Sequence, residues 1–356
     1  MELHNLGKVA WYESQLFYHA FARVGKEALI LLSPSTPYVC IGFHQDAEQE
    51  VDLEHCSANG IPLFRREVGG GAVYLDGNQL FFQLVLLRDN PIIPKNKAMF
   101  YRKFLSPIIN VYRATGIPAE YKPLNDIMVH SRKISGTGVG EIGECVVFVG
   151  NIIIDFDYEM MCRVLRVPDE KFRDKVYRSL MENLTTMKRE LGEERAGQWT
   201  EAKLNHMMAA EFQKITGPLD SESDIMSSPS FQSVLEELRE VMLSEKWLHH
   251  TGKSIAERKV KIRTGANVFQ KMHKAPGGLI RADFEIRDNR YINISFSGDF
   301  FCFPSDAIRG LERKLEGGNV AETKNILLTF YSQKEVEIPG IEVDDWMQLL
   351  ETQKRF

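Results

Sequence analysis

The sequence predicts an α+β protein in which mixed and antiparallel sheets are flanked by helices, followed by a small α+β C-terminal domain. Short apolar runs separated by turn residues follow one another in the first quarter of the chain, which is typical of strands. Patterns with one apolar face, at Val9–Val24 and Lys97–Thr115, predict helices before and after them. From about Trp247 the pattern changes to short alternating segments. The predicted domains are therefore residues 1–245 and 246–356.

Five short apolar runs predict strands in the first part of the chain: Ala28–Leu32, Tyr38–Gly42, Ile61–Phe64, Val73–Leu75 and Leu80–Leu87. The last two are expected to pair as a hairpin around the turn Asp76-Gly77-Asn78. Val51–Asn59 predicts a short helix that ends at Gly60, because glycine is a frequent helix stop.

In the middle of the chain, Asn125–His130 and Lys133–Ser135 predict strands, and the glycine-rich segment Gly136–Gly143 predicts a tight turn or loop. Cys145–Phe156 is rich in β-branched residues and predicts a central strand buried on both sides. Asp169–Gly192 is highly charged and interrupts the strand pattern. Later helices and strands are expected over Trp199–Ile215, Ser233–Leu243, Gly278–Arg287, Tyr291–Phe296, Asp306–Leu315 and Val343–Leu350.

The composition argues against several classes of protein. The formal net charge of −5 gives no electrostatic basis for binding nucleic acid. No apolar run reaches the roughly 20 residues of a membrane helix, and the N-terminus lacks the basic and apolar regions of a signal peptide. The five cysteines form no CxxC pair, which argues against disulfides and a zinc site. We therefore expect a cytoplasmic protein with neither nucleic acid nor membrane as a partner.

The most informative stretch is Arg65–Tyr74, which reads Arg-Arg-Glu-Val-Gly-Gly-Gly-Ala-Val-Tyr. Its three glycines let backbone N–H groups approach a ligand closely, and N–H groups that turn inward form a site for anions. Arg66 adds a planar cation that suits phosphate or carboxylate. A glycine-rich hairpin turn beside a solvated pair of arginines explains the same residues equally well. The stretch alone leaves both interpretations open.

Two motifs together resemble those of the lipoate–protein ligase family, within the biotin/lipoate ligase superfamily. The first is Arg65-Arg66 followed by Gly69–Tyr74, and the second is Asn125-Asp126-Ile127 followed by Arg132–Gly136. One glycine motif would be weak evidence, but two motifs in order and at the expected separation are specific. The resemblance covers most of residues 8–190 and implies the class II aminoacyl-tRNA synthetase-like fold of biotin and lipoate ligases.

The C-terminal part also resembles this family. His273–Ile280 and Ser297–Phe301 are similar to the small accessory domain of these ligases, which is a separate protein in some members. The chain departs from the family pattern at three positions. Leu75 stands where histidine is frequent, Val149 stands where the family usually begins His-Gly-Thr or His-Gly-Ser, and Val68 replaces a small hydroxyl residue.

The resemblance implies a two-step reaction that uses ATP, Mg²⁺ and lipoate. Lipoate is first converted to lipoyl-AMP, and the lipoyl group then passes to a lysine of an acceptor protein. Lys133 is the expected catalytic residue, because its ammonium group can bridge the lipoate carboxylate and the α-phosphate. The residues expected to bind ATP or lipoyl-AMP are Arg66, Gly70, Gly71, Ala72, Val73, Tyr74, Asn125, Asp126, Lys133, Ser135 and Gly136. No side chain is assigned as a dedicated metal ligand, since ATP-bound Mg²⁺ is held largely by phosphates.

Other segments extend this picture. Lys175 and Arg178 fall where the family has a mobile loop. Of the neighbours His44 and Gln45, we expect His44 to be structural and Gln45 to be the better candidate for the pocket. The expected acceptor is a glycine-cleavage H protein, an E2 lipoyl domain or a specialised lipoate-binding protein. Lys253–Lys274 is rich in lysine and arginine, and is either a solvated face or a docking patch for an acidic acceptor.

Two alternative functions remain open. An octanoyl or lipoyl transferase of the same fold needs a thiolate nucleophile, and Cys145 is the one cysteine near the second motif. A non-catalytic paralogue that binds lipoyl proteins is supported by the departures at Leu75 and Val149 alone. Lys133 within the complete second motif, together with the accessory-type C-terminal part, favours the ligase.

Overall fold

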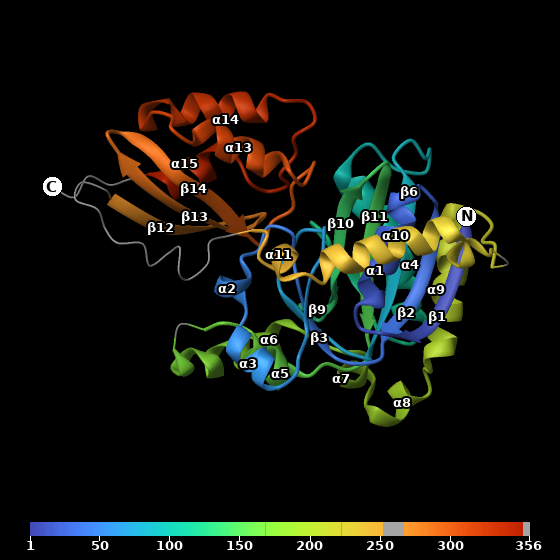
Figure 1. The fold of residues 1–356 in the computed structure, drawn as a ribbon. Coiled ribbons are helices and arrows are strands. Elements are labelled where there is room, and N and C mark those ends of the chain that lie inside the picture. Colours follow the sequence, from blue (N-terminus) through green and yellow to red (C-terminus); the bar gives the residue numbers. More distant parts are fainter. Residues whose placement is uncertain (168, 222, 252–266, 352–356) are drawn as a thin grey trace. The chain divides into compact units, whose positions relative to one another are not determined.

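The fold is taken from a computed structural model that describes residues 1–167, 169–221, 223–251 and 267–351. Its chain divides into two compact units, each assembled from separate stretches of sequence (Figure 1). The first unit comprises Met1–Val39, Glu54–Phe64 and Tyr74–Leu243. The second comprises Cys40–Leu53, Arg65–Val73 and Ser244–Phe356. The assignment of residues 1–245 and 246–356 as catalytic and accessory domains stays a prediction.

A five-stranded sheet forms the centre of the first unit, in the order β1-β2-β6-β11-β10. These strands are β1 (Glu2–Val9), β2 (Ala28–Pro34), β6 (Gln79–Leu87), β11 (Cys145–Ile153) and β10 (Thr137–Ile142). Only β1 and β2 run parallel, and every other neighbouring pair in this sheet is antiparallel. With helices on the sheet, this arrangement confirms the predicted α+β class with mixed and antiparallel pairing.

Helices cover both faces of this sheet. Two successive residues of β6 contact different helices, one on each face. Phe82 packs near Phe212 of α9 (Glu201–Thr216), with ring centroids 5.6 Å apart. The next residue, Gln83, donates to the carbonyl oxygen of Ser14 in α1 (Glu13–Arg23) at 2.5 Å. Because neighbouring side chains of a strand point to opposite faces, α1 and α9 lie on opposite sides of the sheet. The helix α4 (Lys97–Ala114) packs beside α9, and α10 (Pro229–Met242) packs beside α1.

The remaining strands in the first half of the chain form two small sheets. One has the order β4-β3-β5, built from Leu63–Arg65, Tyr38–Ile41 and Val73–Leu75. The other is the meander β7-β8-β9, built from Glu120–Lys122, Asp126–Val129 and Arg132–Ser135. Short helices fill the connections: α2 (Ala47–Glu50), α3 (Leu53–Ala58), α5 (Tyr158–Val164), α6 (Arg173–Asn183), α7 (Met187–Leu191), α8 (Glu193–Gly197) and α11 (Glu245–Leu248).

The second unit has its own core between a meander and three helices. The strands β12 (Asn267–Ala275), β13 (Gly278–Arg287) and β14 (Arg290–Gly298) pair antiparallel in sequence order. The helices are α13 (Ala307–Leu315), α14 (Thr323–Tyr331) and α15 (Val343–Leu350). Buried side chains of both layers meet in one cluster, which includes Phe284, Tyr291, Phe296, Leu311, Phe330 and the fully buried Trp346.

Three expectations from the sequence are wrong. β5 and β6 do not form a hairpin, because β5 pairs within the β4-β3-β5 sheet while β6 lies between β2 and β11. Gly136–Gly143 is not a loop, since Thr137–Ile142 pairs with β11 along its whole length. The segment with Lys175 and Arg178 is the helix α6 rather than a loop. In the first two cases long-range pairing outweighs local turn and glycine signals; in the third, helix-forming Arg, Lys, Leu, Met and Glu dominate.

Among the described residues, no helix combines the length and the apolar character that a membrane crossing requires. All five cysteines are free thiols, and all are buried. Within the described ranges, no group of three or more His, Cys, Asp or Glu side chains is arranged to hold a metal ion.

Candidate active site

Lys133 and Asp126 face each other on neighbouring strands of the β7-β8-β9 meander. The Lys133 ammonium nitrogen lies 2.6 Å from Oδ1 of Asp126, and the two side chains are 36% and 28% exposed. An ion pair with this much exposure is reached by water and contributes little to stability. Lys133 therefore stays accessible to an anionic ligand, and the structure brings together two residues of the second motif.

The backbone at Lys133 and at the residue after it is held firmly. Thr185 donates its N–H to the carbonyl oxygen of Lys133 at 2.8 Å. Next along β9, the Tyr112 hydroxyl of α4 donates to the carbonyl oxygen of Ile134 at 2.8 Å and accepts from the Ile153 N–H at 3.0 Å. Burial raises the pKa of Tyr112 far above its usual range, so the hydroxyl stays protonated and able to donate. The strand β9 thus presents Lys133 from a rigid support.

Arg132, the neighbour of Lys133, is a structural residue. Its guanidinium donates to Oε1 of Glu190 at 2.9 Å, and the Thr185 hydroxyl donates to the same oxygen at 2.5 Å. His130 lies 3.3 Å from the other Glu190 oxygen. These contacts fix the turn between β8 and β9, in which His130 and Ser131 both have positive φ angles.

Ser135 and Gly136 end the second motif on a buried hydrogen-bond chain. The Ser135 hydroxyl donates to the Asn151 carbonyl oxygen at 2.6 Å, and the Gly136 N–H donates to the Asn151 side chain at 2.8 Å. The Asn151 amide then donates to Oε1 of Gln79 at 2.8 Å, and Gln79 donates to the Tyr74 carbonyl oxygen at 3.2 Å. Sequence reasoning missed Asn151 and Gln79 as parts of the site, although Asn151 ends a tripeptide that departs from the family pattern.

Asn125 and Tyr74 are placed by their own contacts. The Asn125 amide donates to the Thr137 carbonyl oxygen at 3.1 Å, and the Thr137 hydroxyl donates to the Asn125 carbonyl oxygen at 2.7 Å. Tyr74 is buried, and burial together with Asp76 and Asp157 raises its pKa to about 12. Leu75, where the family often has histidine, is also buried. An apolar leucine avoids placing a polar ring in this setting.

The part of the first motif from Arg65 to Val73 lies in the second unit, and there Arg65 is fully buried. Its guanidinium donates to carbonyl oxygens on two separate segments. On one segment the acceptors are Gly42, Phe43 and Gln45, at 3.1, 2.8 and 2.6 Å. On the other they are Trp247, at 3.1 Å, and Leu248, at 2.6 Å from the nearer nitrogen. A buried cation needs such partners, so Arg65 joins these segments and is a structural residue.

Arg66 shapes the glycine-rich segment. Its guanidinium donates to the carbonyl oxygens of Gly69 at 2.8 Å and Gly71 at 2.9 Å, and to that of Cys40 at 3.3 Å. Gly70 has a φ of +93°, which favours glycine. A side chain on Gly42 would lie 2.0 Å from the Gly70 carbonyl oxygen, so this position also requires glycine. Unlike Arg65, Arg66 is half-buried and keeps part of its surface in contact with solvent.

His44 and Gln45 are buried beside this segment. Gln45 accepts from the Gly42 N–H at 2.9 Å. His44 stacks on the Phe300 ring with centroids 4.6 Å apart. Burial, with Arg65, His250 and Arg309 adding to it, lowers the pKa of His44 to about 3, so its ring is neutral at neutral pH. His44 is structural as expected, and in this structure Gln45 also braces the backbone.

Two further groups of sequence candidates have surroundings of their own, and a third lies mostly outside the described residues. Lys175 and Arg178 are exposed on α6, where the Lys175 ammonium group lies 5.0 Å from the centre of the Phe172 ring. Cys145 is buried on β11, and burial together with Glu27 and Glu144 raises the pKa of its thiol to about 11. Most of the basic stretch, from Lys253 to Arg263, lies outside the described residues.

Residues 9–213 match the lipoyl protein ligase A/B catalytic domain family. The chain belongs to this family. The recognition made from the two motifs is thereby confirmed, and the match spans more than half of the chain and includes both the second motif and the Arg65–Tyr74 stretch.

Three relatives extend the family assignment. Lipoate-protein ligase A subunit 1 of Thermoplasma acidophilum is 35% identical over 159 residues, which cover 42% of this chain and 59% of the relative. Subunit 2 from the same organism is 41% identical over 83 residues, which cover 23% of this chain and 87% of that subunit. The octanoyltransferase LipM of Geobacillus kaustophilus is 24% identical over 165 residues, covering 40% of this chain and 59% of the relative. The chain thus spans under two thirds of the first and third relatives.

A solved structure supports the fold. A chain of the bipartite lipoate protein ligase from Thermoplasma acidophilum, in a study that includes its E2 lipoyl domain, has a TM-score of 0.61 and 27% identity. The alignment covers 71% of this chain and 98% of that one. The ligase fold expected from the motifs is therefore confirmed.

Proposed function

We propose that this chain is an ATP-dependent lipoate–protein ligase. The observation that carries the proposal is the half-exposed Lys133 ammonium group on a firmly held strand, inside a motif of the ligase family. The similarity of two relatives named as lipoate–protein ligase subunits supports ligation rather than another reaction of the same fold. The two subunits of that ligase also support a catalytic part and an accessory part in this single chain.

The reaction joins lipoate to a protein in two steps. The lipoate carboxylate attacks the α-phosphorus of ATP, and pyrophosphate leaves. An acceptor lysine amine then attacks the carbonyl carbon of lipoyl-AMP, and AMP leaves with the bonding electrons. Such chemistry depends on positioning and on positive charge at the phosphate, rather than on a covalent nucleophile of the enzyme.

Lys133 supplies that charge. When lipoate and ATP are bound, its ammonium group can leave Asp126 and bridge the lipoate carboxylate and the α-phosphate. Asp126 holds Lys133 in place before the ligands arrive and offers a carboxylate oxygen of the kind that Mg²⁺ accepts. A Mg²⁺ ion that accompanies ATP would add neutralisation of the phosphate charge, with Asp126 as the nearby carboxylate.

The remaining site residues have supporting roles. Asn125, Ser135 and Gly136 keep the end of the second motif in position through their contacts with Thr137 and Asn151. Arg66 donates to the carbonyl oxygens of Gly69 and Gly71 and so orders Gly70 between them. The peptide groups that follow, from Gly71 through Ala72 and Val73 to Tyr74, are offered to phosphate. Lys175 and Arg178 on α6 are proposed to move toward the bound nucleotide.

The acceptor and the setting follow from the same proposal. We infer a lipoyl-acceptor protein as the macromolecular partner, and the study of the Thermoplasma ligase with its E2 lipoyl domain favours an E2 domain over an H protein or a specialised lipoate-binding protein. Five buried free thiols fit a reducing, cytoplasmic location.

The transferase alternative is disfavoured by Cys145. A nucleophilic thiol needs a lowered pKa and access to substrate, whereas this thiol is buried and its pKa is raised to about 11.

The decisive experiment is lipoate-dependent exchange of labelled pyrophosphate into ATP. Lys133→Ala is expected to lower the exchange rate by about a hundredfold or more, because a group that stabilises transition-state charge is lost. Lys188→Ala is the matched control, since Lys188 is 33% exposed and pairs with Asp155 at 2.9 Å. Absence of exchange by the unmodified chain, or equal losses in both variants, would exclude the proposal.

A further inference from the structure

The turn at the end of β14, residues 298–301, contacts the glycine-rich segment within the second unit. The Gly70 N–H donates to the carbonyl oxygen of Phe300 at 3.4 Å. A Cβ atom on Gly69 would lie 2.6 Å from that oxygen and 3.0 Å from Cδ1 of Phe301. The backbone at Gly69 therefore approaches the 298–301 turn more closely than a side chain permits.

Two groups confine the next residue, Gly70. The position of a Cβ atom there lies 3.1 Å from Nη2 of Arg66 and 3.3 Å from Cζ of Phe301. The same Arg66 nitrogen donates to the carbonyl oxygens of Gly69 and Gly71. The guanidinium group and the Phe301 ring together leave the Gly69–Gly71 peptides little freedom to move.

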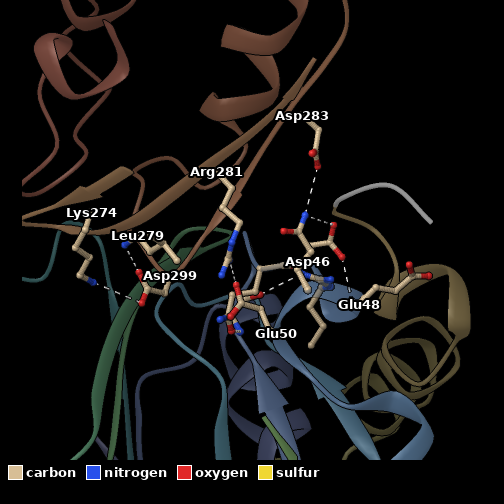
Figure 2. Close-up of polar contacts among 12 residues, drawn as sticks. Asp46, Glu48, Glu50, Lys274, Leu279, Arg281, Asp283 and Asp299 are labelled. Carbon is tan, nitrogen blue, oxygen red and sulfur yellow. Dashed lines mark hydrogen bonds and ion pairs between the residues drawn. The ribbon is translucent and has the colours of Figure 1, made fainter. Parts of the chain in front are cut away.

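The 298–301 turn is itself anchored to its own sheet (Figure 2). Asp299 donates its N–H to the Leu279 carbonyl oxygen at 3.1 Å, and its carboxylate accepts from the Leu279 N–H. The Lys274 ammonium group lies 3.9 Å from the same carboxylate. On the other side of the turn, Gly298 donates its N–H to the His44 carbonyl oxygen at 2.9 Å. These hydrogen bonds fix the position of the 298–301 turn, so the turn can hold the backbone of Gly69 and Gly70 in place.

The sheet also holds the segment Cys40–Leu53. Arg281 of β13 pairs with Glu50, and both side chains are largely buried (Figure 2). The Gln49 amide donates to Oδ2 of Asp283 at 3.4 Å. Burial raises the pKa of Glu50 even though Arg281 opposes that shift, so the desolvation of the Glu50 carboxylate is substantial. Both stretches that the second unit takes from the first quarter of the chain are therefore braced by the β12–β14 sheet.

We propose that Phe301, together with the carbonyl group of Phe300, positions the glycine-rich segment for binding the phosphates of ATP. The nature of the ligand rests on the proposed function, whereas the positioning contact does not. Two constraints then require glycine at positions 69 and 70. The backbone must let a ligand approach closely, and a side chain there would crowd the 298–301 turn. Phe301 is a positioning residue, because it acts on the nucleotide through the Gly69–Gly71 backbone.

Amide hydrogen exchange of the full chain tests the positioning without any need for activity. Phe301→Ala is expected to speed exchange in peptides covering residues 65–73 by about tenfold or more, because loss of a packing contact lowers the local opening free energy. Phe301→Tyr keeps the ring and should restore slow exchange. Phe269→Ala is the matched control, since Phe269 is half-buried in the same unit but stacks on Phe284. If alanine prevents folding, Phe301→Leu carries the same expectation.

Unchanged exchange in residues 65–73, or the same change in the Phe301→Ala and Phe269→Ala chains, would overturn the proposal. A second readout is the KM for ATP in the pyrophosphate exchange reaction. Phe301→Ala should raise it about fivefold or more, with recovery in Phe301→Tyr, since misplaced binding groups weaken nucleotide binding. If the unmodified chain catalyses no exchange, the proposed function fails while the hydrogen-exchange result still decides the positioning. Normal catalysis with unaltered protection of residues 65–73 refutes the positioning alone.

Discussion

Arg65 and Arg66 are neighbours in the sequence, but their surroundings differ. Arg65 is fully buried and donates to five carbonyl oxygens, and burial lowers its pKa to about 10, so it remains a cation at neutral pH. Arg66 is half-buried and organises the glycine-rich segment. One arginine therefore serves stability, while the other is available to serve the ligand site.

This difference predicts that the two alanine variants change different properties of the chain. Arg65→Ala should lower the free energy of unfolding by about 3 kcal/mol or more, because several buried carbonyl groups lose their donor. Arg66→Ala should cost less stability but raise the KM for ATP by about tenfold, the loss expected for a charged hydrogen bond. Urea denaturation followed by tryptophan fluorescence and the pyrophosphate exchange assay measure the two quantities.

Arg290→Ala provides the reference for that pair, since Arg290 is exposed and donates to the Gly317 carbonyl oxygen at 2.7 Å. If Arg65→Ala and Arg66→Ala raise the KM for ATP equally in chains that remain folded, the assignment of Arg66 to the nucleotide is wrong.

At the scale of elements, the sequence predicts helices better than it predicts strand partners. Lys97–Thr115 is found as Lys97–Ala114, because a helix shows its buried face in its own local pattern. β1 was missed since its polar residues His4 and Asn5 obscure the apolar pattern, and its pairing with β2 depends on residues 28–34. Pairing of β6 with β11 likewise brings together residues that are 58 positions apart at Leu87 and Cys145 and 74 apart at Gln79 and Ile153, which no local signal encodes.

The same distinction applies to the site. Lys133, Asp126, Ser135 and Gly136 are recognisable because they lie within one short motif. Asn151 is recognisable from the structure alone, because its side chain joins Gly136 to Gln79 of β6 and thus acts between segments that are distant in sequence.

The role of Asn151 in joining elements can be tested by mutation, because its side chain accepts a hydrogen bond from Gly136 and donates one to Gln79. Asn151→Thr adopts the residue that the family usually has here, but threonine is too short to reach Gln79 and Gly136 together. It should lower the free energy of unfolding by about 1–3 kcal/mol, the cost of leaving buried polar groups without partners. Urea denaturation measures the change, and Asn59→Thr, in the exposed turn that follows α3, is the control. Stability equal to that of the unmodified chain would show that the contact is dispensable.

At the scale of the whole molecule, the second unit is built from three stretches of chain, but its apolar core comes from the C-terminal stretch alone. The buried cluster runs from Ala275 to Leu350. Cys40–Leu53 and Arg65–Val73 contribute instead the Arg65 hydrogen bonds, the Glu50–Arg281 pair and the packing of glycines on the 298–301 turn. A core that lies within one continuous stretch can form before these contacts do.

This organisation predicts that the chain can be divided. Co-expressed fragments of residues 1–243 and 244–356, cut in the turn between α10 and α11, should bind each other through the contacts of residues 40–53 and 65–73. Affinity purification through a tag on one fragment measures the assembly. Arg281→Glu should weaken binding by about a hundredfold or more, because it places two like charges at a buried pair. Exchanging both charges, with Glu50→Arg, should recover part of the loss.

Arg287→Glu is the control for that series, since Arg287 lies on the same strand and its side chain is 45% exposed. Its effect on binding should stay within the small range of a surface ion pair, about 1 kcal/mol or less. Folded fragments that elute separately would show that residues 40–53 and 65–73 do not hold the second unit together. Fragments that assemble but respond equally to Arg281→Glu and Arg287→Glu would show instead that the other contacts of residues 40–53 and 65–73 suffice without the buried ion pair.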